Sequence, residues 1–308
     1  MRLGLVGSGH VGEIVAYTAS LLGNADEIIF NDVKKERMES EALDINDGSQ
    51  FYPNGTKACF GEYKHLANCD IIVVCSGLIP ETGDRLDELE LNKNAVGDYI
   101  EEIVEAGFDG YFIVVTNPCD VITYQVFKKS GFPKNKVIGS GTALDSTRFN
   151  VMMAEILGLS PNAIRGMMLG EHGESQFVPW SQIFVDHVPF EEYAKLHPEK
   201  LETFDKDEFE AKVRARGWDV YKGKGSTQYG IANTVNAIIR AITHDTKVIL
   251  NVSTYLDGQY GVEDVFLSTP CVIGKNGIEE VIELELTEEE LKRYQESAEI
   301  IKKHIELL

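Results

Sequence analysis

The chain has 308 residues, of which 43% are apolar and 26% charged, so neither a disordered nor a collagen-like chain is expected. Acidic residues outnumber basic ones by 50 to 29, which gives a formal net charge of −21. Such a surface repels phosphate backbones, so we expect no nucleic acid and no membrane as partners, although a small anion can still bind where cations or helix N-termini gather.

Short apolar runs alternate with longer amphipathic stretches in the first half of the chain. The expected strands are 3–6, 28–30, 71–75, 111–115 and 137–138, and the expected helices are 11–22, 34–47, 88–106 and 118–130. Several of these runs are continuously apolar, as is typical of strands that are covered on both faces. The alternation of strand and helix predicts an α/β fold with a doubly wound parallel sheet.

The pattern changes in the second half. We expect a helix at 144–157, a strand at about 164–169, two long helices at 204–222 and 226–243, and strands at 247–254 and 262–267. A capping box that begins at Thr287 opens a final helix. The length predicts two domains, and no linker rich in proline or serine separates them. We therefore expect two closely packed domains, residues 1–145 and 146–308.

Five cysteines are spread along the chain without a C-x-x-C pair: Cys59, Cys69, Cys75, Cys119 and Cys271. This pattern disfavours a disulfide scaffold and a zinc site, so we expect no metal and a reducing, cytoplasmic location. The apolar run at the N-terminus ends at Gly7, and nowhere are 18 consecutive residues apolar. We expect neither an export signal nor a membrane span.

Residues 7–12 read G-x-G-x-x-G between an expected strand and an expected helix, which is the pattern of a dinucleotide-binding turn. Gly7 permits the tight turn, Gly9 lets the backbone approach a pyrophosphate, and Gly12 lets helix and strand pack closely. His10 and Val11 lie between these glycines, where the helix N-terminus offers free N–H groups to phosphates. We expect all five residues to contact the cofactor.

Asp32 lies 20 residues after Gly12, at the end of the next expected strand. A carboxylate at this place hydrogen-bonds the ribose hydroxyls and repels the additional phosphate of NADP, so NAD is the expected cofactor. Lys34 and Lys35 follow closely and weaken that preference. The alternative is a glycine-rich turn with a merely solvated aspartate, which the combination of strand, glycines, helix and acid disfavours.

Three further segments carry residues suited to chemistry: 76–85, 141–148 and 170–175. Asp145 and Arg148 are three residues apart on an expected helix and therefore share a face. His172 lies between two glycines after an apolar run, which indicates a strand end with a close backbone approach. Alone, the pair would be read as a local ion pair and the histidine as structural. Together with the nucleotide motif they predict an active site.

Taken together, these motifs resemble the lactate/malate dehydrogenase family over essentially the whole chain. The resemblance rests on 7–12, Asp32, the Ser76-Gly77 turn, Thr-Gly-Asp-Arg ending at Arg85, Val115-Thr116-Asn117-Pro118, 144–148 and 170–173. Within the family the chain is most similar to the branch of L-2-hydroxyisocaproate and L-lactate dehydrogenases, through 131–133, 170–177 and 223–225.

The resemblance implies a Rossmann domain that binds NAD, followed by an α+β substrate domain, and a homodimer or homotetramer. It also implies that Ser76, Gly77, Thr116 and Asn117 contact the cofactor. Some bacterial members are activated by fructose bisphosphate through an arginine and a histidine. The matching positions here are Asn150 and Arg165, so this activation is not expected.

The family's reaction passes a hydride between the nicotinamide and C2 of a 2-oxo acid. The resemblance implies that His172 supplies the proton and that Asp145 fixes its tautomer and stabilises the imidazolium. Arg148 would clamp the substrate carboxylate with two parallel hydrogen bonds. Arg85 would polarise the carbonyl when its loop closes. Asn117 would lie near the nicotinamide and the substrate oxygen.

Family members read the substrate side chain largely in the loop before Arg85, where the matching place is Ile79 or Pro80. Neither is charged, so the second carboxylate of oxaloacetate would be buried without a partner and malate is disfavoured. The alternative is that these two residues only shape the loop. Gly217 lacks a Cβ and would leave room, and Thr227 would lie against the side chain. We expect a branched or apolar 2-oxo acid such as 2-oxoisocaproate, with pyruvate as the alternative.

Two other classes compete with this interpretation. NAD-dependent glycosidases share the fold lineage but need a metal-binding cysteine and histidine, and the residues around Cys119 and His172 do not reproduce their pattern. A module that only senses NAD would not require the catalytic set, which is Arg85, Asn117, Asp145, Arg148 and His172. Oxidation of NADH by 2-oxo acids would separate all three classes.

Overall fold

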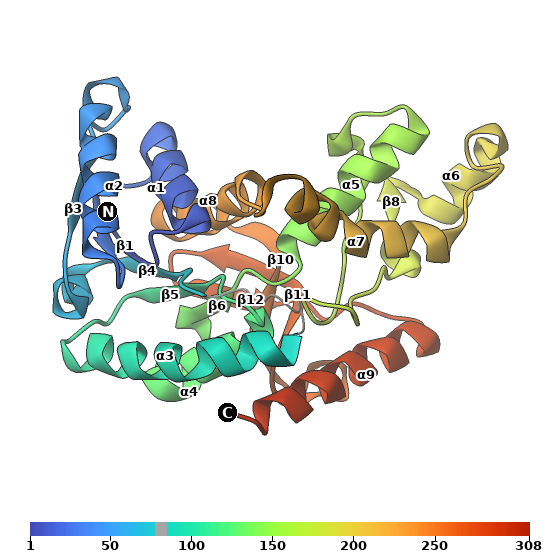
Figure 1. Ribbon diagram of the computed structural model, residues 1–308. Helices are drawn as coiled ribbons and strands as arrows, with labels where there is room; N and C mark the ends of the chain where they lie inside the picture. Colours follow the sequence, from blue (N-terminus) through green and yellow to red (C-terminus); the bar gives the residue numbers. More distant parts are fainter. Residues whose placement is uncertain (78–84) are drawn as a thin grey trace.

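The computed structural model describes residues 1–77 and 85–308, and the side chains of all of these except 85–87. Its centre is a nine-stranded sheet in the order β12-β11-β10-β6-β5-β4-β1-β2-β3 (Figure 1). The first six strands are β1 Arg2–Val6, β2 Glu27–Asn31, β3 Lys57–Phe60, β4 Ile71–Val74, β5 Tyr111–Val114 and β6 Val137–Gly139. They are mutually parallel, which confirms the predicted doubly wound parallel sheet.

Helices cover both faces of this sheet (Figure 1). One face packs against α1 His10–Leu22, α2 Lys35–Asp47 and α8 Tyr229–His244, and the other against α3 Arg85–Glu105, α4 Cys119–Ser130 and α9 Glu288–Ile305. Alternate residues of one strand enter the two cores: Ile71 and Val73 join the first, and Ile72 and Val74 the second. Burial on both sides explains why these strands read as continuous apolar runs.

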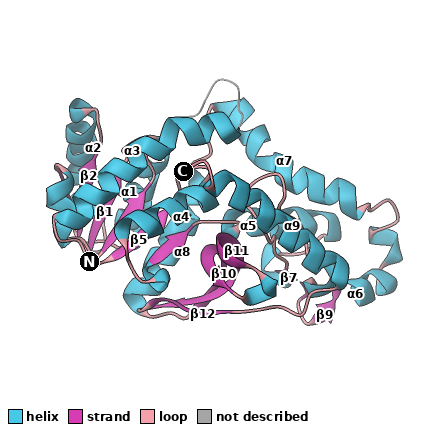
Figure 2. Ribbon diagram, turned by 90° about the horizontal axis from the view of Figure 1, so that it is seen from below, coloured by secondary structure: helices cyan, strands magenta, loops and turns pink. Residues whose placement is uncertain are grey.

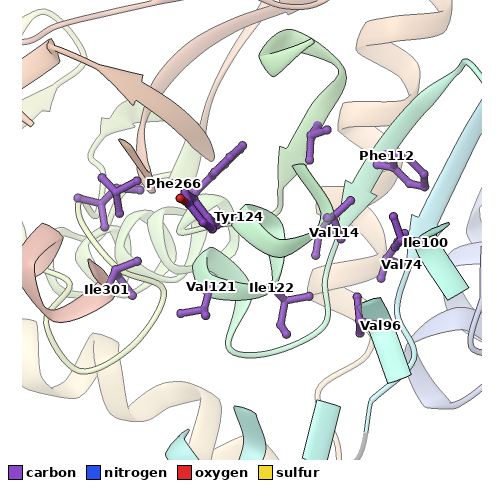
Figure 3. Packing of buried hydrophobic residues seen from close by; sticks show 14 of the residues in the cluster. Val74, Val96, Ile100, Phe112, Val114, Val121, Ile122, Tyr124, Phe266 and Ile301 are labelled. Atoms are coloured by element: carbon purple, nitrogen blue, oxygen red, sulfur yellow. The ribbon is translucent and has the colours of Figure 1, made fainter. Parts of the chain in front are cut away.

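The second core shows how α3 and α4 are seated on the sheet. Val96 and Ile100 of α3 lie beside Val74 and Phe112 of the strands (Figure 3). All four side chains are almost completely buried. This packing, together with that of Val121 and Ile122 from α4, fixes both helices on the sheet.

The second half of the chain continues the same sheet and adds a smaller body. Strands β10 Val248–Asp257, β11 Glu263–Gly274 and β12 Gly277–Val281 extend the sheet in antiparallel fashion from β6. The smaller body holds α5 Ala143–Leu157, α6 Phe190–Leu196, α7 Lys206–Lys224 and a three-stranded sheet of β7 Ile164–Arg165, β8 Phe184–Val185 and β9 Val188–Pro189. It has its own apolar core and lies at the end of the molecule opposite α2 (Figure 2).

Several predicted elements need correction. The strand expected at 164–169 is only Ile164–Arg165, and Leu169 makes an isolated bridge to Phe177. The helix expected to end at 222 continues to Lys224 and ends at Gly225 with φ 79°, and the helix expected from 226 begins at Tyr229. Strand β3 was not predicted, since only one of its four residues is buried and the apolar pattern is weak.

The predicted capping box of the last helix is confirmed. The hydroxyl of Thr287 accepts the N–H of Glu290, and the Glu290 carboxylate accepts the N–H of Thr287. Within the described ranges, no helix combines the length and the apolar character that crossing a membrane requires.

Candidate active site

The loops that follow β1, β4, β5 and β6 meet at one edge of the sheet, where parallel strands place their carboxyl ends. A cavity of about 380 Å³ lies there, between the sheet and the smaller body. Twelve of the predicted site residues line it: Gly9, His10, Val11, Ser76, Gly77, Thr116, Asn117, Asp145, Arg148, His172, Gly217 and Thr227. Another hollow, of about 490 Å³ beside α5 and α7, contains none of them.

Three predicted residues fall partly or wholly outside what the structure describes. Ile79 and Pro80 belong to the segment 78–84, which is not described. Arg85 is the first residue of α3, but its side chain is not described. The sequence predictions for these three residues therefore stay predictions.

Asp145 connects two other predicted site residues in the cavity, His172 and Arg148. Its Oδ2 lies 2.7 Å from Nδ1 of His172, and its Oδ1 accepts a hydrogen bond of 2.7 Å from Nη1 of Arg148. The carboxylate is 1% exposed. Burial by itself would raise the pKa of Asp145, but the charges and hydrogen bonds of His172 and Arg148 outweigh burial and lower it. The group is thus an anion that holds both side chains in place.

The loop that carries His172 is fastened from elements far away in the sequence. The N–H of His172 donates to Oδ2 of Asp120 at 2.7 Å, and the N–H of Glu171 donates to the hydroxyl of Ser297 in α9 at 2.9 Å. Gly170 pairs with Ser268 of β11. Sequence reasoning missed Asp120 and Ser297, because neither belongs to a local motif.

The dinucleotide motif has the geometry that its three glycines predict. Gly7 has φ +102°, and a Cβ on it would lie 2.5 Å from the backbone nitrogen of Ser76. A Cβ on Gly12 would lie 2.0 Å from the carbonyl oxygen of Gly7, so helix and strand are in direct contact. A Cβ on Gly9 would meet nothing within 4 Å. The open backbone is therefore at Gly9, where a pyrophosphate would approach.

Asp32 is a fixed anion at the end of β2. Its Oδ2 accepts the N–H and the hydroxyl of Ser8 at 2.7 and 3.0 Å, and its Oδ1 accepts the N–H of Lys34 at 2.9 Å. Burial opposes the charge, but these hydrogen bonds outweigh burial and lower the pKa of Asp32. Arg37, which sequence reasoning missed, is nearby and bonds the Ser8 carbonyl and Glu13.

The loops after β4 and β5 are tied to one another. The hydroxyl of Thr116 donates to the carbonyl of Ser76 at 2.5 Å, and the Ser76 hydroxyl lies 2.9 Å from that of Tyr99 in α3. The Nδ2 of Asn92 donates to the carbonyl of Asn117 at 3.1 Å. These bonds hold the backbone of both loops at the floor of the cavity.

Buried polar atoms without a partner gather around this cavity. In the part of the chain that the structure describes there are four such side-chain atoms, namely Asn117 Oδ1, Gln125 Oε1, Gln176 Oε1 and Ser226 Oγ. All except that of Gln125 belong to residues that line the cavity. Because buried polar groups are almost always hydrogen-bonded, these atoms indicate that the cavity is shaped for a polar ligand. Together with the open turn at Gly9, they fit a bound dinucleotide and a small polar substrate.

Helix α7 supplies a wall that sequence reasoning found only in part. Its lining residues Arg214, Gly217, Trp218 and Tyr221 follow the i, i+3, i+4, i+7 spacing of one helical face, so that spacing was the signal available in the sequence. A Cβ on Gly217 would lie 3.3 Å from Nη1 of Arg148. The space that this glycine leaves therefore adjoins the guanidinium. Apolar side chains of Leu144 and Ile231 also line the cavity.

In a comparison with known protein families, both halves of the chain match domains of the same family. Residues 1–139 match the NAD binding domain of lactate/malate dehydrogenase, and residues 142–308 match the alpha/beta C-terminal domain of lactate/malate dehydrogenase. No group of three or more His, Cys, Asp or Glu side chains that could hold a metal occurs among the residues described.

Individual relatives match over nearly their full lengths. The chain is 37% identical to an L-lactate dehydrogenase of Fusobacterium nucleatum over 306 residues, 99% of this chain and 96% of that protein. It is 37% identical to L-lactate dehydrogenase 3 of Bacillus thuringiensis over 308 residues, 100% of this chain and 98% of that protein. The solved structure of a minor L-lactate dehydrogenase from Enterococcus mundtii is 33% identical, covers 100% of this chain and 98% of its own, and superposes with a TM-score of 0.95. The chain therefore belongs to the lactate/malate dehydrogenase family and is an NAD-dependent oxidoreductase that acts on a 2-hydroxy acid.

Proposed function

We propose that the protein interconverts a small 2-oxo acid and its L-2-hydroxy acid, with pyruvate and L-lactate as the first candidate pair. The observation that carries the chemistry is that the buried carboxylate of Asp145 bonds both His172 and Arg148 inside the cavity. The choice of pyruvate is supported by relatives named L-lactate dehydrogenase at 37% identity. It was the alternative substrate in the sequence analysis.

His172 is proposed as the acid and base. Because Nδ1 lies 2.7 Å from the Asp145 carboxylate, Nδ1 carries a hydrogen and Nε2 is the nitrogen left for the substrate oxygen. Asp145 also stabilises the imidazolium form of His172. From this form, His172 gives its proton to the oxygen on C2 of the substrate. NAD, when bound, supplies or accepts the hydride.

Arg148 is proposed as the clamp for the substrate carboxylate. Only its Nη1 is engaged by Asp145, and the side chain remains 14% exposed to the cavity. A planar guanidinium can present two parallel N–H groups to a carboxylate. Asn117 and Thr227 line the same cavity, and Arg85 keeps the carbonyl-polarising role that the resemblance implies.

We assign cofactor binding to the motif of β1 and α1 and to the loops after β2, β4 and β5. The open turn at Gly9 and the fixed carboxylate of Asp32 support this assignment. The residues concerned are Gly7, Gly9, His10, Val11, Gly12, Asp32, Ser76, Gly77, Thr116 and Asn117.

A larger apolar 2-oxo acid such as 2-oxoisocaproate is the second candidate substrate. The uncharged Ile79 and Pro80 and the missing side chain of Gly217 favour it. Malate is disfavoured because neither Ile79 nor Pro80 can pair a second carboxylate.

The test is the oxidation of NADH by purified protein with pyruvate, 2-oxoisocaproate, phenylpyruvate and oxaloacetate, compared as kcat/KM. Pyruvate should give the highest value. A higher value for 2-oxoisocaproate would establish the second candidate. A higher value for oxaloacetate would overturn both.

We further propose that the protein assembles as a homodimer or homotetramer in the cytoplasm. Helices α1 and α2 leave the large apolar side chains of Tyr17, Leu21 and Leu43 between 47% and 64% exposed, which favours a partner subunit on this side. All five cysteines are free, as a reducing compartment requires. Light scattering on the purified protein at micromolar concentration would report the assembly, and a monomer would contradict it.

The division into domains at residues 145 and 146 is likewise a proposal. It falls in the first turn of α5, the helix that leads from the parallel strands to the smaller body. Limited proteolysis with mass mapping of the fragments tests whether the two parts separate there.

A further inference from the structure

A buried carboxylate lies directly behind the catalytic loop. Asp120 is in the first turn of α4 and is 1% exposed. Its Oδ2 accepts the backbone N–H of His172 at 2.7 Å, and its Oδ1 accepts the hydroxyl of Ser253 in β10 at 2.5 Å. One side chain therefore links α4, β10 and the His172 loop.

The position of Asp120 has a simpler explanation, because an acid in the first turn of a helix is stabilised by the helix dipole. That explanation does not account for where its oxygens point. The two oxygens accept hydrogen bonds from residues 52 and 133 positions away in the sequence. The carboxylate is thus directed at the catalytic loop and its support.

The surroundings make the negative charge of Asp120 costly. Burial raises the pKa of its carboxyl to about 6, against the hydrogen bonds from Ser253 and His172, and the nearby charge of Glu171 adds to the rise. Cys119 and, from α9, Tyr294 are the other titratable groups that interact with it. An asparagine could accept the N–H of His172 with its Oδ1 and donate an N–H of its Nδ2 to the hydroxyl oxygen of Ser253. The fold itself therefore does not require an acid here.

We propose that Asp120 is a positioning residue for His172, which fixes the backbone of its loop and places a second negative charge, besides Asp145, close to the imidazolium. This inference rests on the proton-transfer role proposed for His172. Charges of both signs lie around this histidine. The Asp145 carboxylate bonds its ring and the Arg148 guanidinium, and the Asp120 carboxylate bonds its backbone N–H and interacts electrostatically with its side chain and with Glu171. A buried negative charge favours the protonated ring, which is the form that reduction of a 2-oxo acid consumes.

The test replaces Asp120 by asparagine and measures kcat/KM for reduction between pH 5.5 and 9.5. Activity in this direction falls as the ring loses its proton at high pH. Without the charge of Asp120 the protonated ring is less stable, so we expect the alkaline limb to move to lower pH by about half to one unit. At any one pH on the descending limb, kcat/KM should therefore fall by roughly 3- to 10-fold, and the dissociation constant of NADH, measured by fluorescence, should stay within about twofold.

Stability separates this role from a structural one. The melting temperature of Asp120→Asn at pH 8 should equal or exceed that of the unmodified protein, because a charge is no longer buried. The matched control is Asp109→Asn, which removes an exposed carboxylate far from the cavity and should leave the pH profile unchanged. An unmoved alkaline limb in Asp120→Asn overturns the proposal, whatever the melting temperature.

Three further variants keep the test decisive. Ser253→Ala removes a hydrogen bond but keeps the charge, so its alkaline limb should coincide with that of the unmodified protein, and an equal shift would mean that packing rather than charge is responsible. If Asp120→Asn does not fold, Asp120→Ser is measured with the same criterion. His172→Gln isolates the underlying assumption: unchanged turnover in that variant would overturn the role of the histidine and this inference with it.

Discussion

The nucleotide turn and the catalytic loop lie at the same edge of the sheet but are built in opposite ways. The turn is local in sequence: Gly7, Gly9 and Gly12 fall within six residues, and a Cβ on Gly12 would meet Gly7 itself, while the turn also packs against Cys75 and Ser76. The catalytic loop is assembled from afar, since Asp120, Asp145 and Ser297 hold it from three helices. Damage to the turn should therefore affect cofactor binding, and damage to the loop should affect turnover.

The largest expected effect comes from the loop. His172→Gln should fold and bind NADH but lose at least about a hundredfold in kcat, because a positioned proton donor contributes roughly 10²–10⁴-fold. Stopped-flow or steady-state reduction of pyruvate measures the loss, and NADH fluorescence checks that the cofactor site is intact. Turnover near that of the unmodified protein would refute the assignment of the acid.

The next effect concerns the substrate alone. Arg148→Lys should raise KM for the 2-oxo acid by roughly 10- to 30-fold, since an ammonium cannot form two parallel hydrogen bonds to a carboxylate. The affinity for NADH should not change. A control is Arg216→Lys, a neighbouring arginine outside the cavity of about 380 Å³. If Arg148→Lys leaves KM unchanged for every 2-oxo acid, the clamp is another residue.

The nucleotide turn offers a paired test of stability against binding. Gly12→Ala would push a methyl group to 2.0 Å from the Gly7 carbonyl oxygen, so it should lower the free energy of unfolding by about 2–3 kcal/mol and also weaken NADH binding. Gly9→Ala meets no atom within 4 Å, so the fold should be unaffected while NADH binding weakens by about tenfold. Thermal melts and NADH titrations of both variants provide the comparison. If Gly9→Ala and the unmodified protein bind NADH equally well, the pyrophosphate does not bind at this turn.

What the sequence could predict follows the same division. The glycine motif, the shared face of Asp145 and Arg148, and the flanking glycines of His172 are patterns of short spacing, so local rules were sufficient. Asp120, Ser253 and Ser297 reach the site only through the packing of α4, β10 and α9, and nothing near them in the sequence marks that approach. Strand β3 was not predicted because three of its four residues are exposed. The end of α7 was predicted too early because a helix tolerates Gly223.

The smallest expected effect is on the preference for NADH over NADPH. It tests whether Asp32, which lies outside the glycine turn, contributes to the recognition of the cofactor. Asp32 holds its charge through three hydrogen bonds from Ser8 and Lys34, which lower its pKa, so it stays anionic at any pH where the enzyme would work. Asp32→Ala should weaken NADH binding and narrow the preference for NADH over NADPH by about 5- to 10-fold, because the additional phosphate no longer meets a negative charge. Removal of the carboxylate also takes one negative charge away from Arg37, which is ion-paired with Glu13 and Glu41, and this favours the phosphate further. Titration of both reduced cofactors by fluorescence gives the ratio directly, and Asp47→Asn, an acid at the far end of α2, is the control. An unchanged ratio would place the ribose contact outside β2 and its following turn, and would mean that the local motif specifies the pyrophosphate but not the ribose.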